Sequence, residues 1–129
     1  MKGLTVLIVV LSIPFFAFIN QDKHKIIIEK WSIGSTTFKG NTAYCNSCPQ
    51  IEFKADGTAK LIYPSQDLAY YSWSARKNQM TLILDSATTR SPYFSEFNYS
   101  FKIKQESQFY KLSIVNDANG YTYNLGRSK

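Results

Sequence analysis

Residues 45–63 carry the strongest local folding signal in this sequence. Apolar and polar side chains alternate on both sides of the pair Asp56-Gly57. An Asp-Gly pair between two alternating segments is the strongest short-range signal for a β-hairpin. The apolar positions are Ile51, Phe53, Ala59, Leu61 and Tyr63. The stretch therefore predicts two antiparallel strands that each bury one face.

The same period-two pattern recurs along the chain after residue 25. It predicts eight strands, at 26–34, 50–55, 58–63, 68–75, 79–85, 97–104, 108–115 and 121–125, and longer loops at 35–48 and 86–96. The connections are too short for parallel crossovers, and a meander with one apolar face can close without leaving edges exposed. The predicted fold of residues 25–129 is all-β, an eight-stranded antiparallel up-and-down β-barrel. A sandwich of two four-stranded sheets is the alternative.

The first 20 residues predict a secretory signal helix. Leu4 to Ile19 is apolar except for Thr5 and Ser12, and a polar run follows. The apolar stretch is shorter than the roughly 20 residues that a spanning helix needs, which favours a signal peptide. An uncleaved N-terminal anchor stays open, because the residues around a cleavage site after Ala17 are not small. The predicted location is secreted, periplasmic or in the cell envelope.

Composition indicates one packed domain. The chain has 129 residues, of which 16% are aromatic, and a net charge of +6. That aromatic content argues against disorder. Lys and Arg are scattered singly, so the charge is interpreted mainly as a solubility feature, and no nucleic-acid partner and no membrane contact beyond the N-terminal segment are predicted. The chain is expected to be a monomer.

Cys45 and Cys48 form a C-x-x-C motif. Such a motif can be a redox dithiol or half of a zinc site. Here the chain has no further cysteine, His24 is the only histidine, and Cys48-Pro49 leads into a strand rather than a helix. In an exported chain we therefore predict a local disulfide that shapes the loop before residue 50.

In an up-and-down barrel, successive connections lie at opposite ends. This places all the long loops at one end, which we predict to be the mouth of the barrel. Strand direction then puts the following residues at or above the mouth as candidate ligand contacts: Tyr63, Leu84, Arg90, Phe97, Tyr99 and Tyr121. Trp31 and Arg127 are predicted at the closed end. Several large inward side chains favour a filled core, whereas the number of inward phenols, each needing a hydrogen-bond partner, favours an open mouth, water or a polar ligand.

No catalytic machinery is predicted. His24 lies in a basic segment before the first strand, where it is expected to be solvated. Glu29 is the one carboxylate on an apparently inward face. At the start of a strand, its side chain is expected to be exposed at the rim rather than to act as a general acid. A paired-carboxylate or nucleophile–base site cannot be assembled from these residue types. No cofactor and no metal site are predicted.

Four short motifs resemble the small secreted lipocalin-like domains of bacteria. They are Glu29-Lys30-Trp31, Ile51-x-Phe53-x-x-Asp56-Gly57-Thr58, Tyr71-x-Trp73 and Met80-Thr81-Leu82, and the resemblance extends over most of residues 26–127. Glu29 stands where that family has Gly. The resemblance implies a calyx-type barrel able to hold an apolar molecule, with Arg127 packed on Trp31.

Three function hypotheses follow. The first is a non-catalytic barrel that binds a small apolar or amphipathic ligand at its mouth. The second is a protein-interaction module, such as an inhibitor or an envelope component, that uses loops 35–48 and 86–96 around a filled barrel. The third, nucleic-acid binding, is the weakest, because the aromatic residues alternate inward whereas stacking platforms must be exposed.

Overall fold

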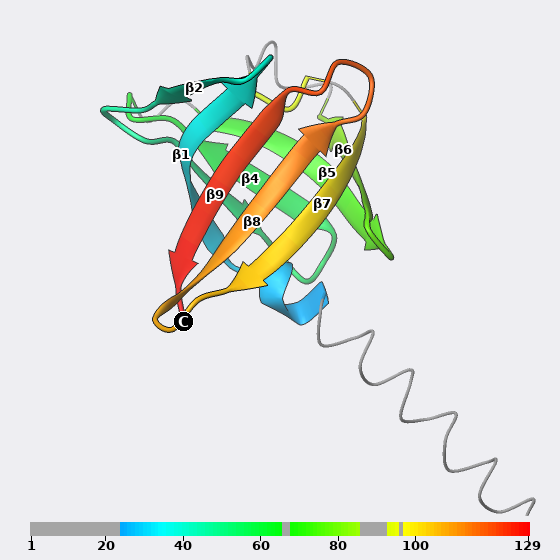
Figure 1. Cartoon of the computed structure of the whole chain (residues 1–129). Helices are drawn as coiled ribbons and strands as arrows, with labels where there is room; N and C mark the ends of the chain where they lie inside the picture. Colours follow the sequence, from blue (N-terminus) through cyan, green and yellow to red (C-terminus); the bar gives the residue numbers. More distant parts are fainter. Residues whose placement is uncertain (1–23, 66–67, 86–92, 96) are drawn as a thin grey trace, which may run out of the picture.

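A computed structural model describes residues 24–65, 68–85, 93–95 and 97–129, and its strands form one antiparallel sheet (Figure 1). Eight of the strands close into a barrel because the first, β1, pairs with the last, β9. The strands are β1 (Lys30–Phe38), β2 (Asn41–Tyr44), β3 (Gln50–Phe53), β4 (Thr58–Ile62), β5 (Leu68–Arg76), β6 (Gln79–Leu84), β7 (Asn98–Gln105), β8 (Phe109–Asn116) and β9 (Thr122–Ser128). The prediction of an all-β, eight-stranded, closed antiparallel barrel is confirmed.

The first strand differs most from its prediction. Residues 24–27 form a helical turn, and β1 begins only at Lys30. It then continues through Gly34 to Phe38, with a register shift against β9 between Ile33 and Ser35. A bulge of this kind inserts one extra residue. The inward side chains are therefore Trp31 and Ile33 before the bulge, and those at even-numbered positions after it. The alternation that marks the other strands is broken here.

The predicted loop 35–48 is therefore wrong over most of its length. Residues 35–38 belong to β1, and β2 folds back on them in a hairpin, with Phe38 opposite Asn41 and Ser35 opposite Tyr44. Every residue of β2 is exposed. Such a strand has no apolar face, so its sequence carries no period-two signal.

The core is built from the inward faces of the barrel strands. Its fully buried side chains include Ile51, Phe53 and Leu61 from the hairpin around Gly57. Gly57 has a φ of 89° and completes this turn, where glycine carries no steric penalty. Asp56 accepts hydrogen bonds from the backbone N–H and the hydroxyl of Thr58. These bonds, the side-chain one first, lower the pKa of the Asp56 carboxyl.

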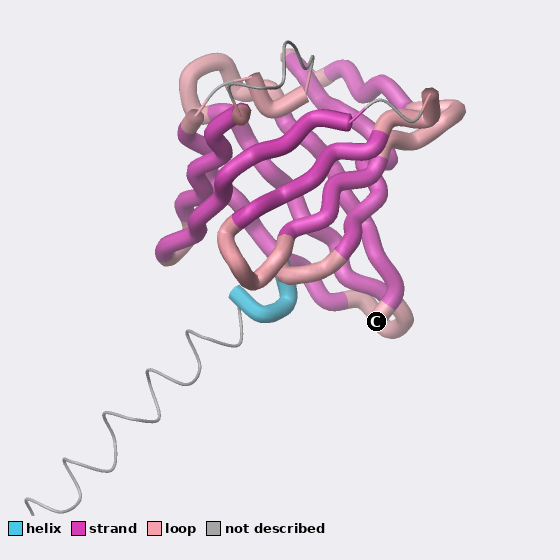
Figure 2. The backbone as a smooth tube through the Cα atoms, turned by 180° about the vertical axis from the view of Figure 1, so that it is seen from behind, coloured by secondary structure: helices cyan, strands magenta, loops and turns pink. Residues whose placement is uncertain are grey.

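The two ends of the barrel are different. Long connections join β2 to β3, β4 to β5, β6 to β7 and β8 to β9 at one end, as the sequence predicts. The turns after β3, β5 and β7, the helical turn 24–27 and the C-terminus lie at the opposite end, as Figures 1 and 2 show from two sides. We call these the mouth end and the closed end.

The segment predicted as a signal helix, residues 1–20, lies outside the described residues. Within the described part of the chain, no helix is both long enough and apolar enough to cross a membrane.

Candidate functional site

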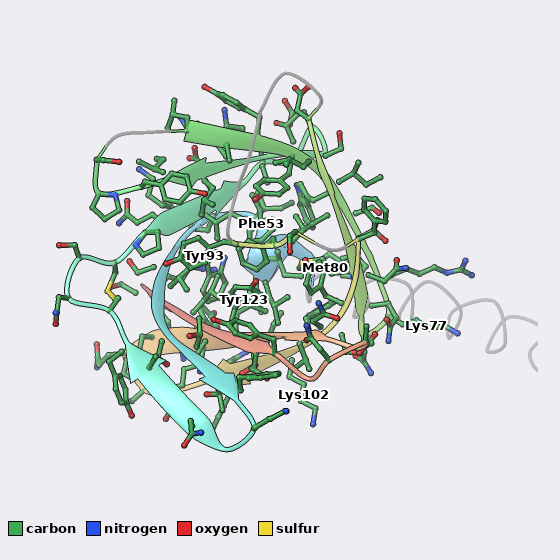
Figure 3. The ribbon with its side chains drawn as sticks, turned by 90° about the horizontal axis from the view of Figure 1, so that it is seen from above. Phe53, Lys77, Met80, Tyr93, Lys102 and Tyr123 are labelled. Atoms are coloured by element: carbon green, nitrogen blue, oxygen red, sulfur yellow. A yellow bond between two sulfur atoms is a disulfide. The ribbon has the colours of Figure 1, made fainter. Side chains whose placement is uncertain are left out.

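The mouth end contains a continuous cluster of aromatic rings. We call it the mouth cluster, and its members come from β1, β5, β7, β9 and the connections after β4, β6 and β8. They are Phe38, Tyr63, Tyr71, Tyr93, Phe94, Tyr99, Tyr121 and Tyr123. Seen from above in Figure 3, Tyr93 and Tyr123 lie inside the ring of strands. The cluster therefore occupies the opening of the barrel.

Phe94 is the central ring of this cluster. It is 1% exposed, although it belongs to the connection between β6 and β7. Its ring centroid lies 4.2 Å from that of Tyr123, 6.0 Å from that of Tyr99 and 6.3 Å from that of Tyr71. The contacts with Tyr99 and Tyr71 are edge-on, a favoured arrangement for aromatic pairs. Phe94 thus forms the floor of the mouth and covers Tyr99 beneath it.

Two phenols hold this connection in place. The hydroxyl of Tyr71 donates a hydrogen bond to the carbonyl of Tyr93 at 2.8 Å, and the backbone N–H of Phe94 donates to the hydroxyl of Tyr123 at 3.0 Å. The sequence raised the question of what satisfies the inward phenols. For these two, the answer is the backbone of the chain itself.

The remaining members form the upper rim. Phe38 is 38% exposed and lies 5.7 Å from Tyr121. Tyr93 lies 6.0 Å from Tyr63, and Tyr63, Tyr93 and Tyr121 are all half-buried. Each therefore presents part of its ring to solvent above the Phe94 floor.

The electrostatics of the mouth favour neutral phenols. Burial raises the pKa of Tyr93, and the nearby phenols of Tyr121 and Tyr63 raise it further. Burial also raises the pKa of Tyr123, against the lowering effect of its hydrogen bond from Phe94. The converging hydroxyls can both donate and accept hydrogen bonds at neutral pH. The site is thus an aromatic surface with neutral polar tips.

Five of the six residues predicted to contact a ligand fall into three groups. Tyr63 and Tyr121 lie in the rim, and Leu84 is half-buried at the end of β6. Tyr99 is fully buried beneath Phe94 and faces no solvent. Arg90 lies outside the described residues.

Alternation in the predicted strand 97–104 places Phe97 on the same inward face as Tyr99, and this prediction is wrong. The Phe97 side chain is 61% exposed, because β7 begins one residue later, at Asn98, and the alternation was extended past the end of the strand. The main chain of Phe97 still contributes, since its carbonyl accepts a hydrogen bond from Leu82 N–H.

The sequence did not identify Phe38, Tyr93 or Phe94 as site residues. Phe38 was missed because the bulge in β1 hides its inward direction. Tyr93 and Phe94 were missed because they lie in the expected loop 86–96. One signal was available: they form an aromatic pair within an otherwise small and polar stretch.

The disulfide between Cys45 and Cys48 is present, as predicted. It lies at the mouth end, where the chain passes from β2 to β3 along the same edge of β1. Backbone hydrogen bonds flank it on both sides, from Cys45 N–H to the Gly34 carbonyl and from Ile33 N–H to the Pro49 carbonyl. The bridge therefore fixes the chain beside the bulge in β1.

Trp31 and Arg127 meet at the closed end. The Arg127 guanidinium carbon lies 5.0 Å from the centre of the Trp31 ring and 4.7 Å from that of Tyr110. Arg127 Nη2 donates to the Ile26 carbonyl at 2.8 Å, and Trp31 Nε1 donates to the Ile27 carbonyl at 2.9 Å. These bonds tie the helical turn 24–27 across the end of the barrel.

Glu29 is exposed beside the closed end, in agreement with the prediction of a rim position for it. In the described part of the chain, no group of three or more His, Cys, Asp or Glu side chains is placed to hold a metal ion. The chemistry available at the mouth cluster is aromatic contact and hydrogen bonding through phenols.

Comparison with solved structures identifies a similar barrel. A lipocalin-like protein from Bacteroides uniformis ATCC 8492 matches with a TM-score of 0.58 at 14% sequence identity, over 78% of this chain and 96% of that chain. No family model matches the sequence, and no curated protein is significantly similar to it. The fold is thus lipocalin-like, and at this identity the likeness extends to the fold alone.

Proposed function

We propose that this chain is an exported, lipocalin-like barrel that binds a small apolar or amphipathic molecule at the mouth cluster. The observation that carries the proposal is the half-exposed rim of Tyr63, Tyr93 and Tyr121 above the buried ring of Phe94. Small-molecule sites are typically concave and lined by aromatic side chains with a few convergent polar groups. The mouths of β-barrels are among their preferred places.

The proposed binding mode is shallow. An apolar part of the ligand would lie on the ring faces of the rim, and a polar part would exchange hydrogen bonds with the phenols. Deeper entry would require Phe94 to leave its place, which would break the hydrogen bonds of Tyr71 and Tyr123. Phe94 has a φ of 52°, a conformation that costs a bulky residue about 1–3 kcal/mol, and the packed position offsets that cost. We propose no catalytic role for the site.

The test uses anilinonaphthalene sulfonate, a fluorescent amphiphile, titrated into the full chain. Tyr121→Ala is expected to weaken binding roughly tenfold, because it removes a ring worth about 1–1.5 kcal/mol of contact. Tyr70→Ala is the matched control, since Tyr70 is 45% exposed on the outer face of β5 and should leave the affinity unchanged. Equal affinities for both variants and the parent would overturn the proposal.

A second function is supported by β2. Among the described strands, β2 lies at the open end of the strand order, and Tyr44 at its end is 81% exposed. An exposed edge strand can pair with an extended segment of another protein. This supports the interaction-module alternative, in which the β1–β2 hairpin is the contact surface. Tyr44→Ala would then reduce capture of a partner and leave the dye affinity unchanged.

A further inference from the structure

We infer that the closed end of the barrel is a basic face that docks on an anionic phospholipid surface, with the mouth pointing away from it. The inference concerns the opposite end of the molecule from the mouth cluster and does not depend on ligand binding there. It rests on how the fold distributes charges that are scattered singly along the sequence.

The described Lys and Arg side chains gather towards the closed end. Apart from Lys39 at the mouth and Lys60 in the middle of β4, each lies in the closed-end half of its strand or in a closed-end connection. They are Lys25, Lys30, Lys54, Arg76, Lys77, Lys102, Lys104, Lys111, Arg127 and Lys129. Four described carboxylates, Glu29, Glu52, Asp56 and Glu106, lie among these ten cations, whereas the described mouth-end connections hold two carboxylates, Asp85 and Asp117, and one cation, Lys39. The molecule is therefore electrically polarised along the barrel axis.

On the outer face of β7 and β8, the concentration of positive charge lowers the stability of the sheet. Lys104 and Lys111 lie directly opposite each other across the two strands, and like charges in this position are destabilising. Both approach a single carboxylate, that of Glu106, at 3.7 and 3.6 Å. Their side chains remain 74% and 56% exposed. In Figure 3, Lys77 and Lys102 likewise extend away from the barrel.

Two observations favour a membrane over a nucleic acid. The helical turn 24–27 lies at the closed end (Figure 2), so the chain before residue 24, which includes the apolar stretch from Leu4 to Ile19, joins the barrel at the basic face. Beside the Lys residues, Phe109 is 40% exposed, with Lys111 Nζ 5.7 Å from its ring centre. Aromatic and basic side chains together are typical of membrane-surface contacts, whereas a single-stranded nucleic acid needs several exposed stacking rings.

The experiment measures partitioning of the full chain onto vesicles of phosphatidylcholine alone and of phosphatidylcholine mixed with phosphatidylglycerol. The apolar N-terminal stretch acts on both vesicle types, so the ratio of the two partition constants isolates the charge effect. We expect a ratio well above one that falls as salt is added. Lys104→Gln and Lys111→Gln should each lower it roughly fivefold at physiological salt, the effect of one basic residue near an anionic surface.

Lys39→Gln is the matched control. A strand of eight residues such as β7 is about 26 Å long, which exceeds the Debye length of about 8 Å at physiological salt, so this change should leave the ratio unaltered. A ratio of one, or equal losses from Lys39→Gln and Lys104→Gln, would overturn the inference. Tighter binding of the full chain to duplex DNA than to the anionic vesicles would also overturn it, in favour of a nucleic-acid partner. Urea unfolding of each variant confirms that the barrel is intact.

Discussion

At the residue scale, one large buried ring lies at each end of the barrel, and hydrogen bonds with nearby parts of the fold hold it in place. Trp31 is fully buried at the closed end and bonds to the Ile27 carbonyl. Phe94 is buried at the mouth end and is held through Tyr71 and Tyr123. A sequence pattern predicted the burial of Trp31, which lies within a strand. It could not predict that of Phe94, because the contacts of a loop residue are set by the tertiary structure.

Replacing Trp31 by Ala should lower the free energy of unfolding by roughly 3–5 kcal/mol, the usual cost of removing a large buried ring. Urea denaturation measures the change. Trp31→Phe is the matched variant; it keeps most of the ring but loses the bond to Ile27 and should cost distinctly less. A loss under about 1 kcal/mol for Trp31→Ala would contradict the closed-end packing.

The pKa values of Tyr93 and Tyr123 are raised in the folded chain. The free energy of unfolding should therefore fall at high pH. Above about pH 10 the unfolded phenols ionise while the folded ones keep their protons. The stabilisation present below pH 10 is therefore lost as the pH rises through the folded pKa values. Urea midpoints measured from pH 8 upwards should fall less steeply for Tyr123→Phe than for the parent. Tyr44→Phe, at an exposed position, should follow the parent; identical slopes for all three chains would count against buried phenols at the mouth.

At the scale of elements, the hairpin around Asp56-Gly57 and the strands from β4 to β9 follow from alternation and turn chemistry, within one to three residues of their predicted bounds. The β1–β2 hairpin does not. The bulge in β1 reverses its inward face after Gly34, and β2 is held by backbone pairing to β1 rather than by burial. Its stability should therefore depend on local restraints, of which the Cys45–Cys48 disulfide is one.

Reducing that disulfide should loosen the hairpin but leave the barrel folded. The bridge closes a short loop, with a sequence separation of 3, and such a loop contributes at most about 2 kcal/mol through the unfolded chain. Hydrogen exchange should speed up in Asn41–Tyr44 and stay slow in β7 and β8. The exported chain should show no free thiol before reduction. Global unfolding on reduction, or free thiols in the untreated chain, would contradict this role.

Gly57→Ala tests the turn between β3 and β4. At a φ of 89° a side chain is strained, and a Cβ would lie 3.8 Å from the Trp73 carbonyl oxygen, an ordinary contact. The expected loss of unfolding free energy is thus the backbone cost alone, about 1–2 kcal/mol. Urea denaturation measures it, and Gly40→Ala, at a φ of 80° in the exposed β1–β2 turn, provides the comparison for a hairpin outside the barrel. A Gly57→Ala chain as stable as the parent would exclude strain at this turn.

At the scale of the whole molecule, closure of the barrel was predictable because it buries the apolar face of eight half-apolar strands and leaves no barrel edge exposed, whereas the alternative sandwich would leave edge strands. The separation of long and short connections between the two ends followed from the same topology. The set of residues at the mouth could not be predicted from topology, because it depends on a bulge, on a loop residue and on phenols that meet across the barrel. The separation of charge along the barrel axis could not be predicted from the sequence either, because Lys residues far apart in the sequence become neighbours only in the folded chain.

The proposed role of the mouth cluster is to hold a small molecule. Native mass spectrometry of the chain purified from its own host tests it most directly, with Tyr63→Ala and Tyr121→Ala purified in parallel and Tyr70→Ala as the outer-face control. We expect an added mass on the parent and on Tyr70→Ala that is reduced or lost in the two rim variants, and lipid extraction should release an apolar or amphipathic compound. A parent that carries no added mass, or an equal added mass on all four chains, would contradict it.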